Sequence, residues 1–183
     1  MGDATALVIV DTQRGMFETP GLPPVPNGER LLGNVENLIG NAREAGVAVI
    51  HIQHANGPGE PLERGTAGWE IHPRVAPADG EPVVGKETPD SFLDTDLGDV
   101  LEERGIGHIV LAGMQTQYCV DTTCRRAFAL GYRVTLAEDA HGTFGTDHLS
   151  AEQVVRHHNE VLGNGFATVV PTREISFYGG AKP

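Results

Sequence analysis

Short apolar runs alternate with longer segments of helical periodicity along most of this chain. The apolar runs, rich in Val, Ile, Leu and Ala, lie at residues 6–10, 47–52, 82–86, 108–112, 132–137 and 166–170. Such runs are typical of parallel strands, which are buried on both faces of a sheet. Strands that alternate with helices are joined by right-handed crossovers and become parallel. The pattern therefore predicts an α/β fold of three layers, α/β/α, around an open, mainly parallel sheet of about six strands.

The segments between the strands have the spacing and the end signals of helices. One helix is expected to begin after Asn27, a residue that can cap it, and to end at Gly46. Apolar residues recur along it at near-helical spacing, at Leu31, Val35, Leu38, Ile39 and Ala42. Further helices are expected at 97–104, at 119–130 and, capped by Ser150, up to Leu162.

The length of 183 residues predicts a single domain, residues 1–183, since one domain per about 150 residues is the usual expectation. Internal repeats and linkers are absent from the sequence. The stretch 56–81, between the second and third strands, is rich in Gly and Pro and longer than an ordinary connection. We expect it to act as a binding loop or a lid.

The formal net charge of −12 argues against a nucleic-acid partner, because binding to phosphates relies on an excess of Lys and Arg. The sequence contains neither a basic amphipathic segment nor the roughly 20 apolar residues that span a bilayer, so we expect no membrane partner. The first residues lack the basic region of a signal peptide, which predicts a cytoplasmic protein with two free thiols. A homo-oligomer is also expected.

Three reactive side chains stand at the ends of predicted strands. Asp11 closes the first strand, Lys86 closes the third, and Cys119 follows the fourth where a helix is expected to begin. In open parallel sheets, ligands bind beyond the carboxyl ends of the strands. Acyl transfer by a thiol needs a base and a stabiliser of the thiolate, and Asp11, Lys86 and the helix amino-terminus could supply both. The three residues therefore predict a nucleophilic cysteine site.

Each of these residues also has an ordinary structural interpretation. Cys119 could be a small buried hydrophobe, Asp11 could cap the turn after its strand, and Lys86 could be a solvated charge. The polar residues before Cys119, which include Gln115 and Gln117, favour the functional interpretation for the thiol.

Histidines offer two further alternatives. His141, in the segment "LAEDAHGTF" after the fifth strand, is a rival to Asp11 as the base. His51, His54 and His72 would suggest a metal, but no Asp or Glu stands beside them at ligand spacing. We therefore expect neither a metal nor another cofactor.

Several stretches together resemble the isochorismatase-like cysteine hydrolases, which include nicotinamidases, N-carbamoylsarcosine amidohydrolases and ureidoacrylate amidohydrolases. The matching stretches occur in the family's order over nearly the whole chain, and they are "ALVIVDTQRGMF", "WEIHPRVAP", "PVVGKETPDSF", "LAGMQTQYCVDTTCRRAFALGYRVTLAEDA" and "GFATVVPTREI". The resemblance implies the isochorismatase-like hydrolase fold, with Asp11 as acid/base, Lys86 as supporting cation and Cys119 as nucleophile. It also implies a cis peptide between Met114 and Gln115 and an oxyanion hole formed by the N–H groups of Gln115 and Cys119.

Departures from the family pattern narrow the expected activity. The cysteine argues against the vinyl-ether cleavage of the siderophore-pathway members, which lack it. The region "HIQHANGPGEPL" does not reproduce the Asp-x-His metal element of nicotinamidases. The likeness is closest to the metal-free amidohydrolase branch, which includes a streptothricin hydrolase that opens a lactam ring.

We therefore expect hydrolysis of a C–N bond in a small amide, lactam or ureido compound through a thioester. The expected pocket walls are Gln13, Phe17, Trp69 and Tyr118. The alternatives are a nicotinamidase-type amidase, a thiol redox or sensor protein that uses Cys119 without hydrolysis, and a catalytically silent binding module.

Overall fold

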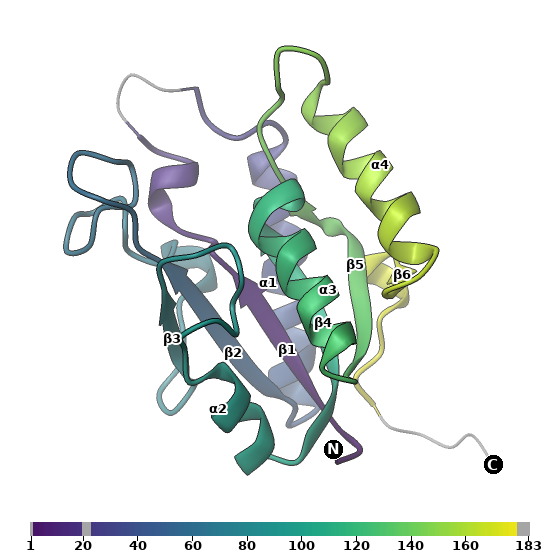
Figure 1. Cartoon of the computed structure of the whole chain (residues 1–183). Coiled ribbons are helices and arrows are strands. Elements are labelled where there is room, and N and C mark those ends of the chain that lie inside the picture. The colour runs from purple at the N-terminus through teal and green to yellow at the C-terminus, as the bar shows by residue number, and fades with distance from the viewer. Residues whose placement is uncertain (1, 20–22, 179–183) are drawn as a thin grey trace.

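The computed structural model describes residues 2–19 and 23–178, and within them the predicted sheet is present. Its strands are β1 (Ala4–Val10), β2 (Ala48–His54), β3 (Val83–Lys86), β4 (Ile106–Met114), β5 (Arg133–Gly142) and β6 (Thr168–Val170). They form one sheet in the order β3-β2-β1-β4-β5-β6, and every pair of neighbours is parallel (Figure 1). The α/β prediction is confirmed, and the described sheet is entirely rather than mainly parallel.

Helices cover both faces of this sheet (Figure 1). They are α1 (Gly28–Glu44), α2 (Leu97–Glu103), α3 (Asp121–Ala129) and α4 (Ala151–Gly163). Side chains of β1 alternate between the two faces: Leu7 and Ile9 pack with α1, whereas Ala6 and Val8 pack with α2, α3 and α4. Both layers of the core are therefore held by the same buried strand. Among the described helices, none combines the length and the apolar character that a bilayer-spanning segment requires.

The order of the strands reverses between β1 and β4. From β1 the chain proceeds to β2 and β3 on one side, and it then returns to place β4, β5 and β6 on the other side. Ligand sites of open parallel sheets lie at this switch, beyond the carboxyl ends of the strands. The residue that follows β1 and the turn that follows β4 are therefore placed side by side.

Strand β5 is longer than the predicted strand at 132–137. Its pairing with β4 shifts in register between Leu111 and Gly113 and then resumes, with Gly113 opposite His141. The charged residues Glu138 and Asp139 lie in the irregular stretch and made the strand seem to end at Ala137. His141 is consequently part of β5, and the prediction that it follows the strand is wrong.

The helix predicted at 119–130 begins earlier than expected. A single π-helical turn, Thr116–Val120, precedes α3 and contains Cys119. The polar sequence before the cysteine has the composition of a loop, but Thr116 is buried and hydrogen-bonded, which draws this segment into the helical run. Cys119 therefore lies within the first turns of the helix and not at its first residue.

The two predicted helix caps have different outcomes. Asn27 precedes α1 in a left-handed conformation with φ of 57°, and its side chain makes no capping hydrogen bond. Its contribution is the backbone turn, which Asn adopts more readily than most residues. Ser150 caps α4 as predicted, because its Oγ accepts from the Gln153 N–H and the Gln153 side chain accepts from the Ser150 N–H.

Gly113 lies where β4 passes closest to the end of β1. It has φ of 115°, and a Cβ added there would lie 2.0 Å from the carbonyl oxygen of Val10. We expect Gly113→Ala to lower the free energy of unfolding by at least about 2–3 kcal/mol, because the strands must separate to admit the methyl group. Thermal unfolding measures the change.

The matched control is Gly85→Ala in β3. An added Cβ at Gly85 meets no atom of the described residues within 4 Å, so the free energy of unfolding of this variant should lie within about 0.5 kcal/mol of the wild-type value. Equal stabilities of the two variants would show that β1 and β4 can separate at little cost.

Candidate active site

Asp11, Lys86 and Cys119 come together at the carboxyl ends of the strands. The Lys86 Nζ lies 2.7 Å from Asp11 Oδ2 and 3.1 Å from Cys119 Sγ. The Asp11 and Lys86 side chains are almost completely buried, and Cys119 is partly buried. Asp11 follows β1 with φ of 44°, Lys86 ends β3, and the π-helical turn after β4 carries the thiol. Asp11, Lys86 and Cys119, which the sequence places at separate strand ends, therefore form one cluster.

His54 is a member of the cluster that sequence reasoning missed. Its Nδ1 lies 3.0 Å from the Lys86 Nζ, which also lies 3.0 Å from the carbonyl oxygen of Thr88. The signal was available: His54 ends β2, the strand between those that end in Asp11 and Lys86. The rule that drew attention to Asp11 and Lys86 therefore applies equally to this histidine.

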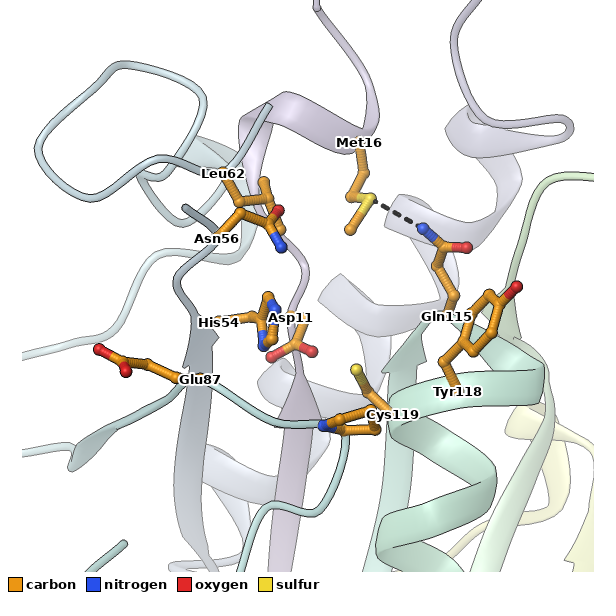
Figure 2. A pocket seen from close by; sticks show the side chains of 10 residues that line it. Asp11, Met16, His54, Asn56, Leu62, Glu87, Gln115, Tyr118 and Cys119 are labelled. Carbon is orange, nitrogen blue, oxygen red and sulfur yellow. Dashed lines mark hydrogen bonds between the residues drawn. The ribbon is translucent and has the colours of Figure 1, made fainter. Parts of the chain in front are cut away.

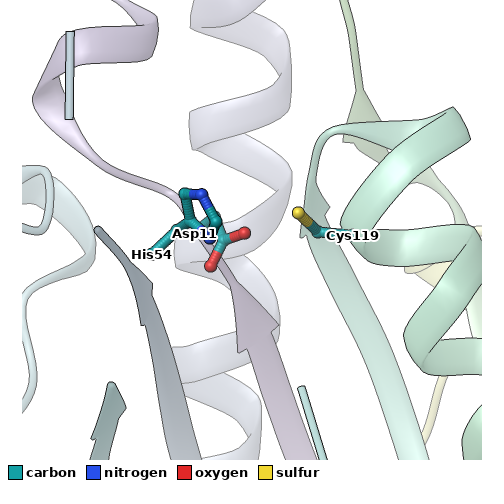
Figure 3. Close-up of side chains that lie close together, drawn as sticks. All are labelled: Asp11, His54 and Cys119. Atoms are coloured by element: carbon teal, nitrogen blue, oxygen red, sulfur yellow. The ribbon is translucent and has the colours of Figure 1, made fainter. Parts of the chain in front are cut away.

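Asp11, His54 and Cys119 have the ligand types of a metal site, and their donor atoms lie within 4.8 Å of one another (Figure 3). The Lys86 ammonium, however, already lies within 3.1 Å of the atom that each of these three residues would offer to a metal. A cation is thus already supplied by the chain at this position. A metal ion there would have to displace the ammonium.

Burial dominates the acid–base properties of the cluster. It raises the pKa of Asp11 above its ordinary value, and the charge of Lys86 opposes this shift. Burial and the negative charge of Asp11 raise the pKa of the Cys119 thiol to about 12, against the opposing effect of Lys86. The sequence suggested a stabilised thiolate, but in this site the resting thiol keeps its proton. Asp11 Oδ1 has no hydrogen-bond partner among the described residues, which leaves a lone pair that could receive that proton.

A cavity of about 260 Å³ opens above the thiol (Figure 2). Its lining residues are Asp11, Met16, His54, Asn56, Leu62, Glu87, Pro89, Gln115, Tyr118 and Cys119. Asn56 and Leu62 belong to the long loop 56–81, which was expected to form part of the pocket. Apolar, amide and carboxylate groups thus line the cavity around one nucleophilic atom, the Cys119 sulfur.

The four predicted pocket walls are placed differently. Tyr118 lines the cavity, whereas Gln13, Phe17 and Trp69 are not among its lining residues. The Gln13 side chain is fully buried and bonds the backbone of His54 and of Trp69. Phe17 packs edge-on against His72, and Trp69 lies beneath the guanidinium of Arg64 in a cation–π contact. These three aromatic and amide groups thus support the loops around the cavity.

The peptide between Met114 and Gln115 is cis, as the family resemblance implied. It lies directly before the π-helical turn that carries Cys119. The Gln115 side chain donates from Nε2 to Met16 Sδ at 3.5 Å (Figure 2) and accepts from the Thr143 hydroxyl at 3.3 Å. The segment expected to form the oxyanion hole is therefore held through the Gln115 side chain by contacts to Met16 and Thr143.

His141, the rival base, lies outside the cavity that contains the thiol. It is buried, with Nδ1 3.0 Å from the Thr116 hydroxyl and Nε2 2.8 Å from Asn159 Oδ1, and it is not among the residues that line the cavity. Burial lowers the pKa of His141 to about 4, so the ring is neutral. Its contacts support the π-helical turn through Thr116, and the geometry favours Asp11 as the base.

A buried carboxylate–ammonium pair beside a cysteine, at the switch point of a parallel α/β sheet, defines a cysteine hydrolase. The sequence profile of the Isochorismatase domain matches residues 5–173. The chain belongs to the isochorismatase family. A crystal structure of a putative isochorismatase hydrolase from Oleispira antarctica superposes with a TM-score of 0.89 and 32% identity, covering 95% of this chain and 96% of that one.

Two curated relatives have named activities. Streptothricin hydrolase from Streptomyces noursei is 34% identical over 185 residues, which cover 97% of this chain and 73% of that protein. The ureidoacrylate amidohydrolase RutB from Agrobacterium fabrum is 29% identical over 82% of this chain and 81% of that protein. Both names agree with the enzyme class predicted from the sequence, a hydrolase of non-peptide C–N bonds.

Proposed function

We propose that this protein hydrolyses the C–N bond of a small amide, lactam or ureido compound through a thioester on Cys119. The observation that carries the proposal is the Lys86 ammonium, which lies 2.7 Å from Asp11 and 3.1 Å from the Cys119 sulfur at the base of a small cavity. This arrangement supplies a nucleophile, a base and a fixed cation without a further component. The named activities of the two relatives support the same chemistry.

Acylation begins with the protonated thiol. Asp11 accepts the proton while Sγ forms a bond to the substrate carbonyl carbon, and the carbonyl electron pair moves to oxygen. The N–H groups of Gln115 and Cys119 stabilise that oxyanion. The oxyanion then re-forms the carbonyl, the C–N bond breaks, and Asp11 returns the proton to the departing nitrogen.

Deacylation repeats these steps with water. Asp11 takes a proton from water as its oxygen attacks the thioester carbon, and collapse of the second oxyanion breaks the C–S bond. The Cys119 sulfur leaves with the bonding electrons and recovers the proton from Asp11. The Lys86 ammonium remains charged throughout: it balances the Asp11 carboxylate at rest and the sulfur as the C–S bond breaks, whereas the N–H groups of Gln115 and Cys119 balance the oxyanions.

The lining of the cavity favours an uncharged or cationic substrate over an anionic one. Its carboxylates are Asp11 and Glu87, and burial and the Lys86 charge lower the pKa of His54 so that this ring is neutral. The Lys86 ammonium is committed to Asp11, His54, Thr88 and the thiol. Asp11 is paired with Lys86 and Glu87 with Arg64, so a substrate carboxylate would find no uncommitted cation among the described residues that line the cavity.

A panel of amides, lactams, carbamoyl compounds and ureido acids tests the proposal, with nicotinamide included for the nicotinamidase alternative. We expect hydrolysis of at least one uncharged or cationic compound, and faster turnover of a primary amide than of the same amide bearing a carboxylate. Quenched reactions should contain protein whose mass is increased by the acyl group, and digestion should place that group on Cys119. Hydrolysis without an acyl-enzyme, or no hydrolysis of any class, would contradict the mechanism.

A thiol-sensor role fits this site less well. Redox-sensing cysteines are exposed and have a low pKa, often beside a resolving cysteine. Burial raises the pKa of Cys119, and Cys124 is a free thiol buried in the core against β1 and α4. A cytoplasmic location and a homo-oligomeric state remain predictions from the sequence.

A further inference from the structure

We propose that His54 is a positioning residue whose Nδ1 atom holds the Lys86 ammonium between Asp11 and Cys119. The proposal rests on the proposed function, because it assigns a task to a residue of the same site. Lys86 has three protons and four neighbours that can accept them, at 2.7 Å (Asp11), 3.0 Å (His54 and Thr88) and 3.1 Å (Cys119). An ammonium can only donate, so His54 Nδ1 must be the acceptor in this contact.

The location of Lys86 explains why its head group needs support. β3 is an edge strand, and β2 separates it from β1, the strand that Asp11 follows. The ammonium must therefore cross the end of β2 to reach Asp11 and Cys119, on a long side chain with many rotamers. His54 is paired with Lys86 in the register of β2 and β3, which places the imidazole where the crossing occurs.

His54 is itself held firmly. The buried Gln13 side chain accepts from the His54 N–H at 2.9 Å and donates to the His54 carbonyl oxygen at 2.9 Å. These bonds fix the backbone of His54 on both sides. A connected set of contacts thus runs from Gln13 through His54 to Lys86, and from Lys86 to the base and the nucleophile.

The same contact fixes the tautomer of the imidazole. A neutral ring that accepts at Nδ1 carries its proton at Nε2. His54 lines the cavity, and its ring lies near the Asp11 carboxylate and the Cys119 thiol (Figure 3), with Nδ1 engaged by Lys86. The Nε2–H is therefore a donor for an acceptor atom of the substrate. Contact with Lys86 and presentation of this donor are two consequences of one ring orientation.

Substitutions at His54 separate these consequences. His54→Asn keeps an acceptor at the position of Nδ1 and loses the donor at Nε2, His54→Gln does the reverse, and His54→Ala removes both. Each is made in a Cys124→Ala background, so that Cys119 is the remaining thiol. The control is His51→Asn, since His51 lies on the same strand but contacts Glu81.

The first readout is the rate of alkylation of Cys119 by iodoacetamide between about pH 6 and about pH 10, which needs no substrate. The charged and titratable groups that face the thiol are Asp11, Lys86 and His54, and those that face His54 are Asp11, Lys86, Glu87 and Cys119. We expect His54→Ala and His54→Gln to slow alkylation about tenfold at a given pH, the effect of a rise of one unit in the thiol pKa. His54→Asn and His51→Asn should keep the wild-type profile.

The second readout is the kinetics on an amide that the wild type hydrolyses. We expect a lower kcat for His54→Ala and His54→Gln, and a raised KM with nearly unchanged kcat for His54→Asn. Alkylation of a folded His54→Ala variant at or above the wild-type rate would overturn the proposal, as would rescue by Gln and not by Asn. If the wild type hydrolyses no amide while alkylation still depends on His54, the proposed function fails and the positioning role stands.

Discussion

Cys119→Ala should abolish turnover, with a loss of at least about 10⁴-fold in kcat, because the covalent step has no other nucleophile in the cluster. Cys119→Ser should be nearly as inactive. A serine hydroxyl holds its proton more tightly than a thiol, and the carboxylate that must remove it is a weak base. Steady-state assays on a responsive amide measure both losses, and mass spectrometry should find no acyl-enzyme with the Ala variant.

Cys124→Ala is the matched control for this loss. Cys124 lies on α3, is fully buried in the core between the sheet and the helices, and does not line the cavity. The control should keep turnover close to the wild type. Wild-type rates in the Cys119→Ala protein on its true substrate would rule out the thioester mechanism.

Asp11→Asn should lower kcat by about 10²–10⁴-fold, the usual contribution of a general base, since an amide cannot accept the thiol proton. The wild type should also lose activity as the pH falls through the raised pKa of Asp11, because a carboxyl group that is already protonated cannot accept the thiol proton. The measurements are a pH–rate profile of the wild type and single-turnover kinetics of the variant. Thermal unfolding should accompany them, because Asn leaves the buried Lys86 without its counter-ion.

His141→Ala is the comparison that decides between the two candidate bases. His141 contacts Thr116 and Asn159, so its loss should reduce stability by about 1–3 kcal/mol and affect kcat much less than Asp11→Asn. If the histidine variant alone were inactive while Asp11→Asn kept turnover, the assignment of Asp11 would be wrong.

The electrostatics of the site favour transfer of the thiol proton from Cys119 to Asp11 over its release to solvent. Asp11 and Lys86 form a buried pair of opposite charge, and the thiol beside them is neutral. When the proton moves from sulfur to the carboxylate as sulfur attacks, the negative charge moves from Asp11 to the substrate oxygen, and the net charge of the site is unchanged. The low-polarity surroundings that raise the pKa of the thiol therefore oppose its ionisation to solvent without opposing its transfer to Asp11.

Much of this arrangement could be predicted from the sequence. The alternation of strands and helices predicted the sheet, and the rule that ligands bind at the carboxyl ends of strands singled out Asp11, Lys86 and Cys119. The same rule applies to His54, but the sequence suggests this histidine as a metal ligand and not as a hydrogen-bond acceptor for a lysine. The reason is chemical, since imidazole serves both tasks and its sequence context does not distinguish them.

The direction in which a side chain points could not be predicted in the same way. His141 and Asp11 both lie near strand ends, yet the register shift in β5 turns the histidine toward Thr116. Gln13, expected to line the pocket, instead holds the backbone of His54. In each case a residue far along the chain determines the outcome.

The architecture and the chemistry that the residues could support follow from the sequence alone, because the periodicity of apolar residues and the type of each side chain are local properties. The three-dimensional arrangement determines which groups meet, which nitrogen of His54 accepts the hydrogen bond from Lys86 and whether the thiol is ionised. Those properties depend on distances and burial set jointly by segments far apart along the chain. Local sequence patterns therefore cannot predict these distances or this burial.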